Sequence, residues 1–301
     1  MLMTVIPLGV ILVTAPLLPG LINKTKAAFA GRQGPPIFQL YFDLLKLLNK
    51  GAVYSRVTTW IFRAGPIVSL ASVLVAACFV PLAGHAALSF SGDIIAFAYL
   101  LGLGRFFTVL AALDTGSSFE GMGASREVTF SMFAEPTLFI IFVILARVTG
   151  SLSLSRMLTQ LPLVVMPSMV GLMALVVFSL FVVCLVENSR IPVDDPATHL
   201  ELTMIHEVMV LDHGGPDLAF ILYGASIKLF VMVAILAHLL FPMQNNSPVQ
   251  AGLVFGSLMA LVAIVIGIVE SVMARLRIIR VPRLLLAASI LAFFAMIITL
   301  R

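Results

Sequence analysis

Eight apolar runs of about 20 residues constrain this sequence more than any other feature. A helix of that length crosses the roughly 30 Å hydrocarbon core of a bilayer. Hydrophobic residues make up 61% of the 301-residue chain and charged residues 11%, whereas roughly 25% of the residues in a soluble domain are charged. Too few charges remain to cover a water-facing surface, so we predict an all-α integral membrane protein. The predicted spans are Leu2–Ile22, Ile61–Leu82, Ile94–Leu113, Val128–Ala146, Leu163–Val186, Leu218–Leu240, Gly252–Val272 and Leu284–Leu300.

The rest of the composition excludes several other classes. Both cysteines, Cys78 and Cys184, lie inside apolar runs, so we expect neither a disulfide framework nor a cysteine-ligated zinc or iron–sulfur site. The basic residues flank the apolar runs, which argues against nucleic-acid binding despite a formal net charge of +4. Leu2–Ile22 is too long for the apolar part of a signal peptide and has no basic segment before it. We expect residues 1–301 to form a single membrane domain.

The distribution of lysine and arginine predicts the orientation of the bundle. Thirteen of the 18 Lys and Arg residues fall on one side of the eight spans and three fall on the other, while Arg105 and Lys228 lie within spans. Cytoplasmic loops carry the excess of basic residues in membrane proteins. We therefore expect both chain ends to lie on the non-cytoplasmic side.

The segment from about 36 to 50 differs from the eight runs. Its polar residues Gln39, Asp43, Lys46 and Lys50 are spaced four, three and four residues apart, which places them on one stripe of a helix. The segment is too short to span a bilayer, so we predict an amphipathic helix in the cytoplasmic interface. Such a helix serves either as a plain membrane anchor or as the entrance or docking floor for a partner.

Three ionisable residues lie inside predicted spans. Glu135 is two to three turns inside the fourth span, and Arg105 and Lys228 are each near mid-span. On insertion scales each such charge costs about 2.5–3.5 kcal/mol, and intramembrane charges commonly pair or mark ion paths. We interpret Glu135 as part of an ion path. Arg105 and Lys228 either belong to the same path or form structural ion pairs with a nearby carboxylate.

An acidic cytoplasmic loop, about 187–217, follows the fifth span. Eleven of the 14 Asp and Glu residues fall between Asp114 and Asp217, including Glu187 and the adjacent pair Asp194 and Asp195. Burial and like-charge neighbours raise carboxyl pKa values toward neutrality, which proton transfer between carboxylates requires. Prolines interrupt the helix here, and broken backbone at membrane depth is tolerated only against protein or a water-filled cavity. We predict a hydrated acidic pocket at the cytoplasmic ends of spans four to six.

Three histidines, His199, His206 and His213, recur in this loop at seven-residue spacing. The run His206-Glu207-Val208-Met209-Val210 is not the H-E-x-x-H pattern of zinc enzymes. We therefore expect a pH-responsive or hydrogen-bonding role instead of a metal site.

Four segments together resemble a known family. They are Gly31-Arg32-Gln33-Gly34-Pro35, then Leu113-Asp114-Thr115-Gly116-Ser117 with Gly123-Ala124-Ser125-Arg126-Glu127 and Glu135-Pro136, then Glu187-Asn188-Ser189-Arg190-Ile191-Pro192-Val193-Asp194 running on to Glu201-Leu202, and Met273-Ala274-Arg275-Leu276-Arg277. Their order, their spacing and the eight-span layout resemble the subunit 1 family of respiratory complex I, the NADH:quinone oxidoreductase, over nearly the whole chain. The L-D-T-G-S and G-A-S-R-E segments are most similar to the hydrogenase branch, that is, to the membrane subunit of formate hydrogenlyase and of hydrogenase-4 type group 4 nickel–iron hydrogenases.

The resemblance assigns roles to particular residues. Acidic positions of the family's polar path match Glu127, Glu135, Glu187, Asp194 and Glu201, and its basic motif positions match Arg32, Arg126 and Arg190. The family usually has E-Y-S-G after the acidic loop, where this chain has Asp212-His213-Gly214-Gly215 after an apparent insertion, so either Glu207 or Asp212 takes the place of that carboxylate. The candidate ion path comprises Arg105, Glu127, Glu135, Glu187, Asp194, Asp195, Glu201, Glu207, Asp212 and Lys228. The candidate docking residues are Arg32, Asp114, Arg126 and Arg190.

The resemblance also implies a function. The chain would be a non-catalytic subunit in a prokaryotic cytoplasmic membrane that docks a peripheral electron-transfer arm and couples its redox chemistry to the movement of protons or sodium ions. The expected partners are hydrogenase large and small subunits, a ferredoxin-like iron–sulfur subunit and antiporter-like membrane subunits. The nickel–iron centre and the iron–sulfur clusters would belong to those partners, and we expect no metal or other cofactor in this chain.

Three alternatives to the hydrogenase-subunit interpretation remain at this point. One is the quinone-binding subunit of an NADH:quinone oxidoreductase. Another is a stand-alone secondary transporter, although such folds usually carry internal repeats and none is visible between the two halves. The third is a purely structural anchor, in which the buried charges move no ion.

Overall fold

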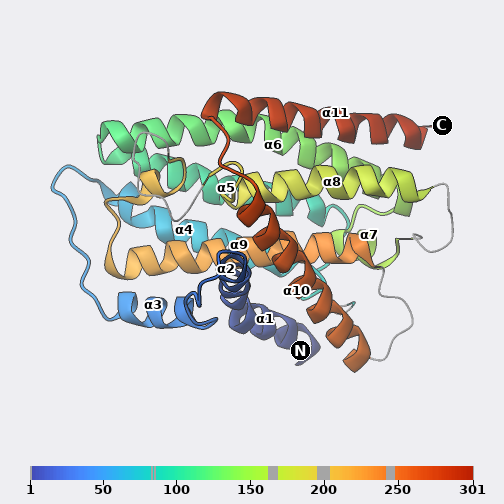
Figure 1. Cartoon of the computed structure of the whole chain (residues 1–301), viewed down its shortest axis with the longest axis horizontal. Helices are drawn as coiled ribbons and strands as arrows, with labels where there is room; N and C mark the ends of the chain where they lie inside the picture. The colour runs from blue at the N-terminus through green and yellow to red at the C-terminus, as the bar shows by residue number, and fades with distance from the viewer. Residues whose placement is uncertain are drawn as a thin grey trace.

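The helices form a bundle with most of its members side by side (Figure 1). The computed structural model describes residues 2–82, 84, 86–161, 169–194, 204–241 and 248–300, and within them eight helical segments are long and apolar enough to cross a membrane, as predicted. The spanning helices are α1 (Leu2–Thr14) with α2 (Leu17–Phe29), α4 (Trp60–Ala77), α5 (Asp93–Asp114), α6 (Ser118–Thr149), α8 (Val170–Glu187), α9 (Gly215–Leu240), α10 (Pro248–Val272) and α11 (Val281–Leu300). The shorter elements are α3 (Gln39–Leu48), α7 (Leu154–Thr159) and the 3₁₀ helices η2 (Glu207–Val210) and η3 (Ile278–Arg280).

The first span is broken into two helices, which the sequence analysis did not predict. Pro16 has no N–H, so the carbonyl of Leu12 loses its helical donor. The hydroxyl of Tyr223 donates a hydrogen bond to that carbonyl at 2.9 Å, and the hydroxyl of Tyr41 donates to the carbonyl of Val13. The two tyrosines therefore satisfy the backbone groups that the break exposes, which membrane burial requires.

The polar end of the bundle holds helices that differ from the predicted spans. α6 begins at Ser118, ten residues before the predicted start at Val128, because hydropathy detects only the apolar part of a helix that continues past the membrane. α8 ends at Glu187, where Ser189 adopts a left-handed φ of 50° and the side chain of Asn188 donates to the carbonyl of Cys184. The chain therefore leaves the helix before Pro192, and irregular backbone follows.

α3 occupies most of the segment predicted as an interfacial helix. Its polar stripe is tied together by a 2.9 Å hydrogen bond from Gln39 to Asp43. One apolar side, which includes Leu40, faces the protein, whereas Phe42 and Leu45 on another side are exposed. An apolar side next to a polar stripe fits a helix that lies in the plane of the membrane interface. Figure 1 places α3 at the opposite end of the bundle from the C-terminus.

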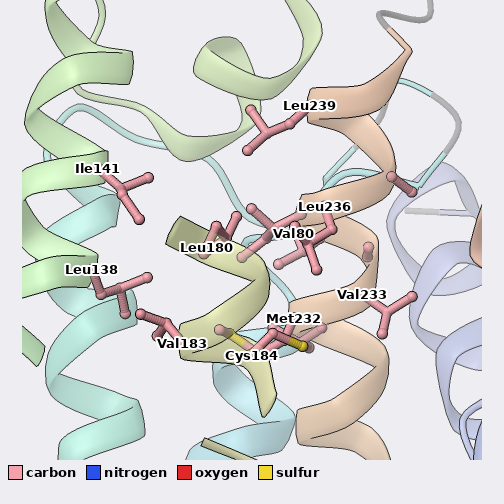
Figure 2. Close-up of a cluster of buried hydrophobic side chains, with 14 of the residues drawn as sticks. Val80, Leu138, Ile141, Leu180, Val183, Cys184, Met232, Val233, Leu236 and Leu239 are labelled. Carbon is pink, nitrogen blue, oxygen red and sulfur yellow. The ribbon is translucent and has the colours of Figure 1, made fainter. Parts of the chain in front are cut away.

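The apolar core surrounds α9, which is buried almost continuously from Ile227 to Leu239. Figure 2 shows Leu138 and Ile141 of α6, Leu180 and Val183 of α8, and Met232 and Leu236 of α9 converging on one cluster. Cys184 belongs to the same cluster, and both cysteines are free thiols. This core holds α6, α8 and α9 together beside the polar region described next.

α2 and α10 approach each other closely at Gly267. A Cβ atom at this position would lie 1.7 Å from the hydroxyl oxygen of Thr25, so only glycine permits the observed separation of the two helices. Small residues at such crossings are a general feature of membrane helix packing. The contact places Lys26 of α2 beside Glu270 of α10, at 2.9 Å.

Candidate functional site

A cluster of five charged side chains lies in the middle of the bundle. The guanidinium of Arg105 on α5 contacts Glu187 on α8 at 2.5 Å and Glu127 on α6 at 3.3 Å. It also pairs with Glu135, eight residues further along α6. The ammonium of Lys228 on α9 contacts Glu187 at 2.8 Å. Four helices therefore contribute to one cluster, which we call the Arg105 cluster: Arg105, Glu127, Glu135, Glu187 and Lys228.

The depth of the cluster follows from where the helices end. Arg105 lies nine residues before the end of α5, roughly 13 Å along the helix axis, whereas Glu187 is the last residue of α8. α8 therefore stops well inside the bundle, and the backbone that follows it is held at the level of the charges. Such backbone must face protein or a water-filled cavity.

The charges within the cluster do not balance. The contacts just described join three carboxylates to two cations among the described residues, so the fully ionised cluster carries one excess negative charge. Glu187 is 4% exposed and Arg105 is 9% exposed, so water screens these pairs weakly. A buried uncompensated charge costs several kcal/mol. Binding one proton to a carboxylate would remove the excess charge, which gives the cluster a chemical capacity for one proton.

A cavity of about 220 Å³ connects the cluster to the acidic loop. Glu127, Glu187 and Lys228 line one part of it, and His206 and Glu207 from the loop line another. The cavity is polar at these positions and has room for several water molecules. It lies where the sequence predicted a hydrated acidic pocket.

Asp194 lines the cavity, and its carboxylate forms hydrogen bonds that hold the loop in place. One of its oxygens accepts hydrogen bonds from the backbone N–H groups of Ile205 and His206, at 3.0 and 3.1 Å. The other oxygen accepts from the guanidinium of Arg275 at 2.8 Å. Three donors fix the orientation of this carboxylate. Asp194 therefore holds the segment after α8 against residues 205 and 206 and against Arg275.

The predicted docking residues lie in different surroundings. Arg126 donates to the carbonyl of Met204 at 2.7 Å and so holds the loop against α6. Arg190 faces Glu270 at 3.5 Å. The carboxylate of Asp114 accepts a hydrogen bond from the backbone N–H of Thr59 at 2.6 Å and so holds the start of α4 in place. Arg32 is exposed in the turn after α2.

The two candidates for the loop carboxylate lie in different surroundings. Glu207 lines the cavity, whereas the side chain of Asp212 is exposed and its backbone N–H donates to Glu120 at 3.2 Å. Asp195 and Glu201 of the predicted path lie outside the described residues, as does His199.

The two described histidines of the loop are kept neutral by burial. Burial lowers the pKa of His206, although the carboxylate of Glu127 opposes this effect. Burial likewise lowers the pKa of His213, whose ring stacks on Phe62 with centroids 3.9 Å apart. Among the described residues, no group of three or more His, Cys, Asp or Glu side chains is arranged to hold a metal ion.

Sequence reasoning missed Glu270 as a site residue. This carboxylate is 4% exposed and pairs with Lys26 and Arg190, so it joins α10 to α2 and to the loop after α8. It lies inside a predicted span, and the test that singled out Glu135, a charge within an apolar run, would have found it.

Comparison with known proteins places this geometry in a family. A family model described as NADH dehydrogenase matches residues 1–300. The chain is 30% identical over 298 residues to formate hydrogenlyase subunit 4 of Escherichia coli (strain K12), an alignment that covers 96% of this chain and 95% of that protein. It is also 30% identical over 273 residues to hydrogenase-4 component C of the same organism, covering 88% of this chain and 85% of that protein.

A solved structure shares the fold. A chain of the membrane-bound sulfane sulfur reductase, an archaeal respiratory membrane complex, matches 99% of this chain and 98% of its own length with a TM-score of 0.85 at 20% identity. The resemblance found in the four sequence segments is therefore confirmed. Because the family model spans nearly every residue, this chain belongs to the NADH dehydrogenase family.

Proposed function

We propose that this chain is the membrane subunit of a complex-I-related hydrogenase of the formate hydrogenlyase or hydrogenase-4 kind, and that its Arg105 cluster couples the redox chemistry of partner subunits to proton movement. The two Escherichia coli relatives support the first part, since one is named a subunit of formate hydrogenlyase and the other a component of hydrogenase-4. The single observation that carries the second part is the excess carboxylate in the Arg105 cluster, which borders a cavity shared with the acidic loop.

The proposed coupling begins at the loop. Electron transfer in a docked partner near the predicted cytoplasmic surface would change the electrostatic field at residues 187–217. That field acts strongly on the Arg105 cluster because its members are weakly screened, and it would change the proton affinity of Glu127 and Glu187. A proton taken up through the hydrated cavity would then pass to Glu135 and on toward an adjacent membrane subunit. The redox centres belong to the partners in this scheme, and sodium is the competing ion.

The size of the cavity favours water over a quinone. Pockets for drug-sized ligands occupy roughly 300–1,000 Å³, whereas this cavity is about 220 Å³. A chain of waters fits such a space and can carry a proton between carboxylates.

The experiment replaces Glu187 in the complete complex, reconstituted in liposomes. We expect Glu187→Gln to evolve hydrogen at a rate within about twofold of wild type while proton movement falls at least about tenfold, because the amide cannot exchange a proton. Hydrogen evolution is measured by gas chromatography and proton movement by a pH-sensitive dye. Asp43→Asn on α3, a carboxylate away from the Arg105 cluster, is the matched control and should leave both rates unchanged.

Assembly is checked in the same samples by native gel electrophoresis. Proton movement that persists in a normally assembled Glu187→Gln complex would show that the cluster is a structural anchor. Ion transport by the purified chain alone would instead favour a stand-alone transporter.

A further inference from the structure

Three exposed arginines follow one another on the turn between α10 and α11. Arg277 directly precedes the 3₁₀ helix η3, Arg280 is the last residue of η3, and Arg283 lies in the first turn of α11. Side chains three residues apart are neighbours on both kinds of helix. The three guanidinium groups therefore lie along the same side of the turn, and we call them the arginine row.

The positive charge of the arginine row is not balanced within the chain. Glu270 is the last acidic residue of the sequence, and among the residues that the structure describes no carboxylate pairs with the row. Lys26 and Arg190, by contrast, both pair with Glu270. The three arginines also repel one another and crowd the N-terminal end of α11, where the helix dipole is positive. A bound anion would therefore stabilise this end of the helix.

The backbone beneath the arginine row is held in place. The N–H of Leu276 donates a hydrogen bond to the carbonyl of Pro192 at 2.8 Å. Arg275 pairs with Asp194 at 2.8 Å, and Ile278 packs against the apolar core. The turn therefore presents its arginines from a fixed backbone, which lowers the entropic cost of binding a ligand.

The arginine row lies at the level of lipid headgroups. α11 has 20 residues and so a length of about 30 Å, which is the thickness of the hydrocarbon core of a bilayer. Its first residue therefore lies at one membrane surface, which the excess of basic residues predicts to be the cytoplasmic one. Figure 1 shows α11 on the outer side of the bundle, beside α6.

Apolar side chains are exposed around the arginine row. They are Val272 at the end of α10, Ile279 within η3 and Leu286 in the second turn of α11. Val272 is 72% exposed and Ile279 is 74% exposed, although both lie where water and hydrocarbon meet. A membrane lipid can therefore contact the arginines with its headgroup and these side chains with its hydrocarbon.

We propose that the arginine row binds the phosphate of an anionic phospholipid, whose acyl chains lie along the exposed apolar side chains of α10 and α11. A guanidinium presents a planar fork of N–H donors that matches the oxygens of a phosphate. Anionic lipids are typical of the cytoplasmic leaflet, and basic residues beside spanning helices bind them. This inference does not use the Arg105 cluster, and it holds whether or not that cluster moves protons.

Two other occupants fit this surface less well. Inorganic phosphate would contact the arginines but would make no use of the apolar side chains. An acidic segment of a water-soluble partner would balance the charge, but it would not follow the surface to Leu286, which lies one turn further into the membrane.

Photo-crosslinking on the purified wild-type complex distinguishes these occupants. The probe is phosphatidylglycerol with a diazirine in its acyl chain, and irradiation should label peptides that contain Val272, Ile279 or Leu286, identified by mass spectrometry. Unlabelled phosphatidylglycerol should compete at least about tenfold better than phosphatidylcholine with the same acyl chains, because only the former is anionic. Equal competition by the two lipids, competition by inorganic phosphate at the same concentration, or peptides that stay unlabelled because a partner covers them overturn the proposal.

Two triple variants that lose the same charge test the arginine row itself. Replacing Arg277, Arg280 and Arg283 by Gln should lower the labelling of these peptides at least about tenfold, since the phosphate loses its donors. Replacing Arg32, Lys50 and Arg56 by Gln removes three exposed charges from the same predicted side of the membrane. This control should label within about twofold of wild type, because salt screens exposed charges that lie further away.

Folding is checked by the melting temperatures of both variants in phosphatidylcholine nanodiscs, which should equal that of wild type. Labelling of the arginine-row variant at the wild-type level, or an equal loss in both variants, contradicts the proposal. The competition experiment uses the wild-type complex and so does not depend on the folding of any variant. Both experiments measure lipid contact and not ion movement, so they can fail while the proteoliposome assay succeeds, or the reverse.

Discussion

At the scale of single residues, the Arg105 cluster depends on the shape of one side chain. A guanidinium presents five N–H donors in a rigid plane, whereas an ammonium is a compact point charge on a flexible stem. Only the former can reach Glu127, Glu135 and Glu187 at once, and it does so here from one position on α5. Lys228 contributes one further contact with Glu187. Arg105 therefore brings these three carboxylates together, as the proposed proton exchange between them requires.

His213 gives a prediction about pH. Burial keeps its pKa below the ordinary value of 6.5, even though Asp217 and Asp212 oppose the shift. The unfolded chain binds this proton more readily, so the histidine lowers stability as the pH falls below about 6.5. We expect the melting temperature of His213→Gln in detergent to fall less than that of wild type between about pH 7.5 and pH 5.5. Phe62→Leu removes the stacking partner but keeps the titrating group, so it should retain the wild-type slope. Equal slopes for wild type and His213→Gln would contradict the assignment.

The sequence identified single site residues better than their partners. Arg105, Glu135 and Lys228 stand out because a charge inside an apolar run is costly, and that cost is visible without coordinates. The contact of Arg105 with Glu187 joins residues 82 positions apart, and nothing in the pattern of either span encodes that pairing. The same holds for Asp194, whose carboxylate accepts hydrogen bonds from Ile205, His206 and Arg275.

At the scale of helices, the crossing of α2 and α10 depends on Gly267. Gly267→Ala forces a methyl group against Thr25, and overpacking of this kind costs about 1–3 kcal/mol. We expect a melting temperature several degrees below wild type, measured by fluorescence in detergent, and a weakened contact between Lys26 and Glu270. Gly256→Ala on the same helix meets no atom within 4 Å and is the matched control. If Gly267→Ala and Gly256→Ala have the same melting temperature, the close contact between Gly267 and Thr25 does not limit stability.

Helix boundaries followed from the sequence where a single physical cause acts. Apolar length located the spanning helices, and the prolines after residue 187 predicted that the helix before them ends there. The break between α1 and α2 needed more than Pro16, since proline within a membrane helix is often tolerated. It is supported by Tyr41 and Tyr223, which come from distant parts of the chain. A sequence pattern indicates the local preference of the backbone, but it does not indicate hydrogen bonds from residues that are distant in the chain, such as Tyr41 and Tyr223.

At the scale of the whole molecule, ion pairs gather around the end of α8. Lys26 with Glu270, Arg190 with Glu270, and Arg275 with Asp194 tie α2, α10 and the segment after α10 to residues 187–194. The Arg105 cluster ties α5, α6 and α9 to the same place. The other part of the bundle is packed by apolar side chains such as those in Figure 2. A change of charge near residue 187 would therefore act on many helices at once.

The orientation of the molecule gives the last prediction. The excess of basic residues predicts that the loop containing Val53 faces the cytoplasm and that Leu152, beyond the other end of the bundle, faces away from it. Val53 is 89% exposed and Leu152 is 55% exposed, so each accepts a labelling cysteine. In a Cys78→Ala background, a membrane-impermeant maleimide should label Leu152→Cys in intact spheroplasts. It should label Val53→Cys only after lysis, while Cys184 stays buried. The reverse pattern would place the acidic loop and the cavity outside the cell, out of reach of cytoplasmic redox partners, and the proposed coupling would then be wrong.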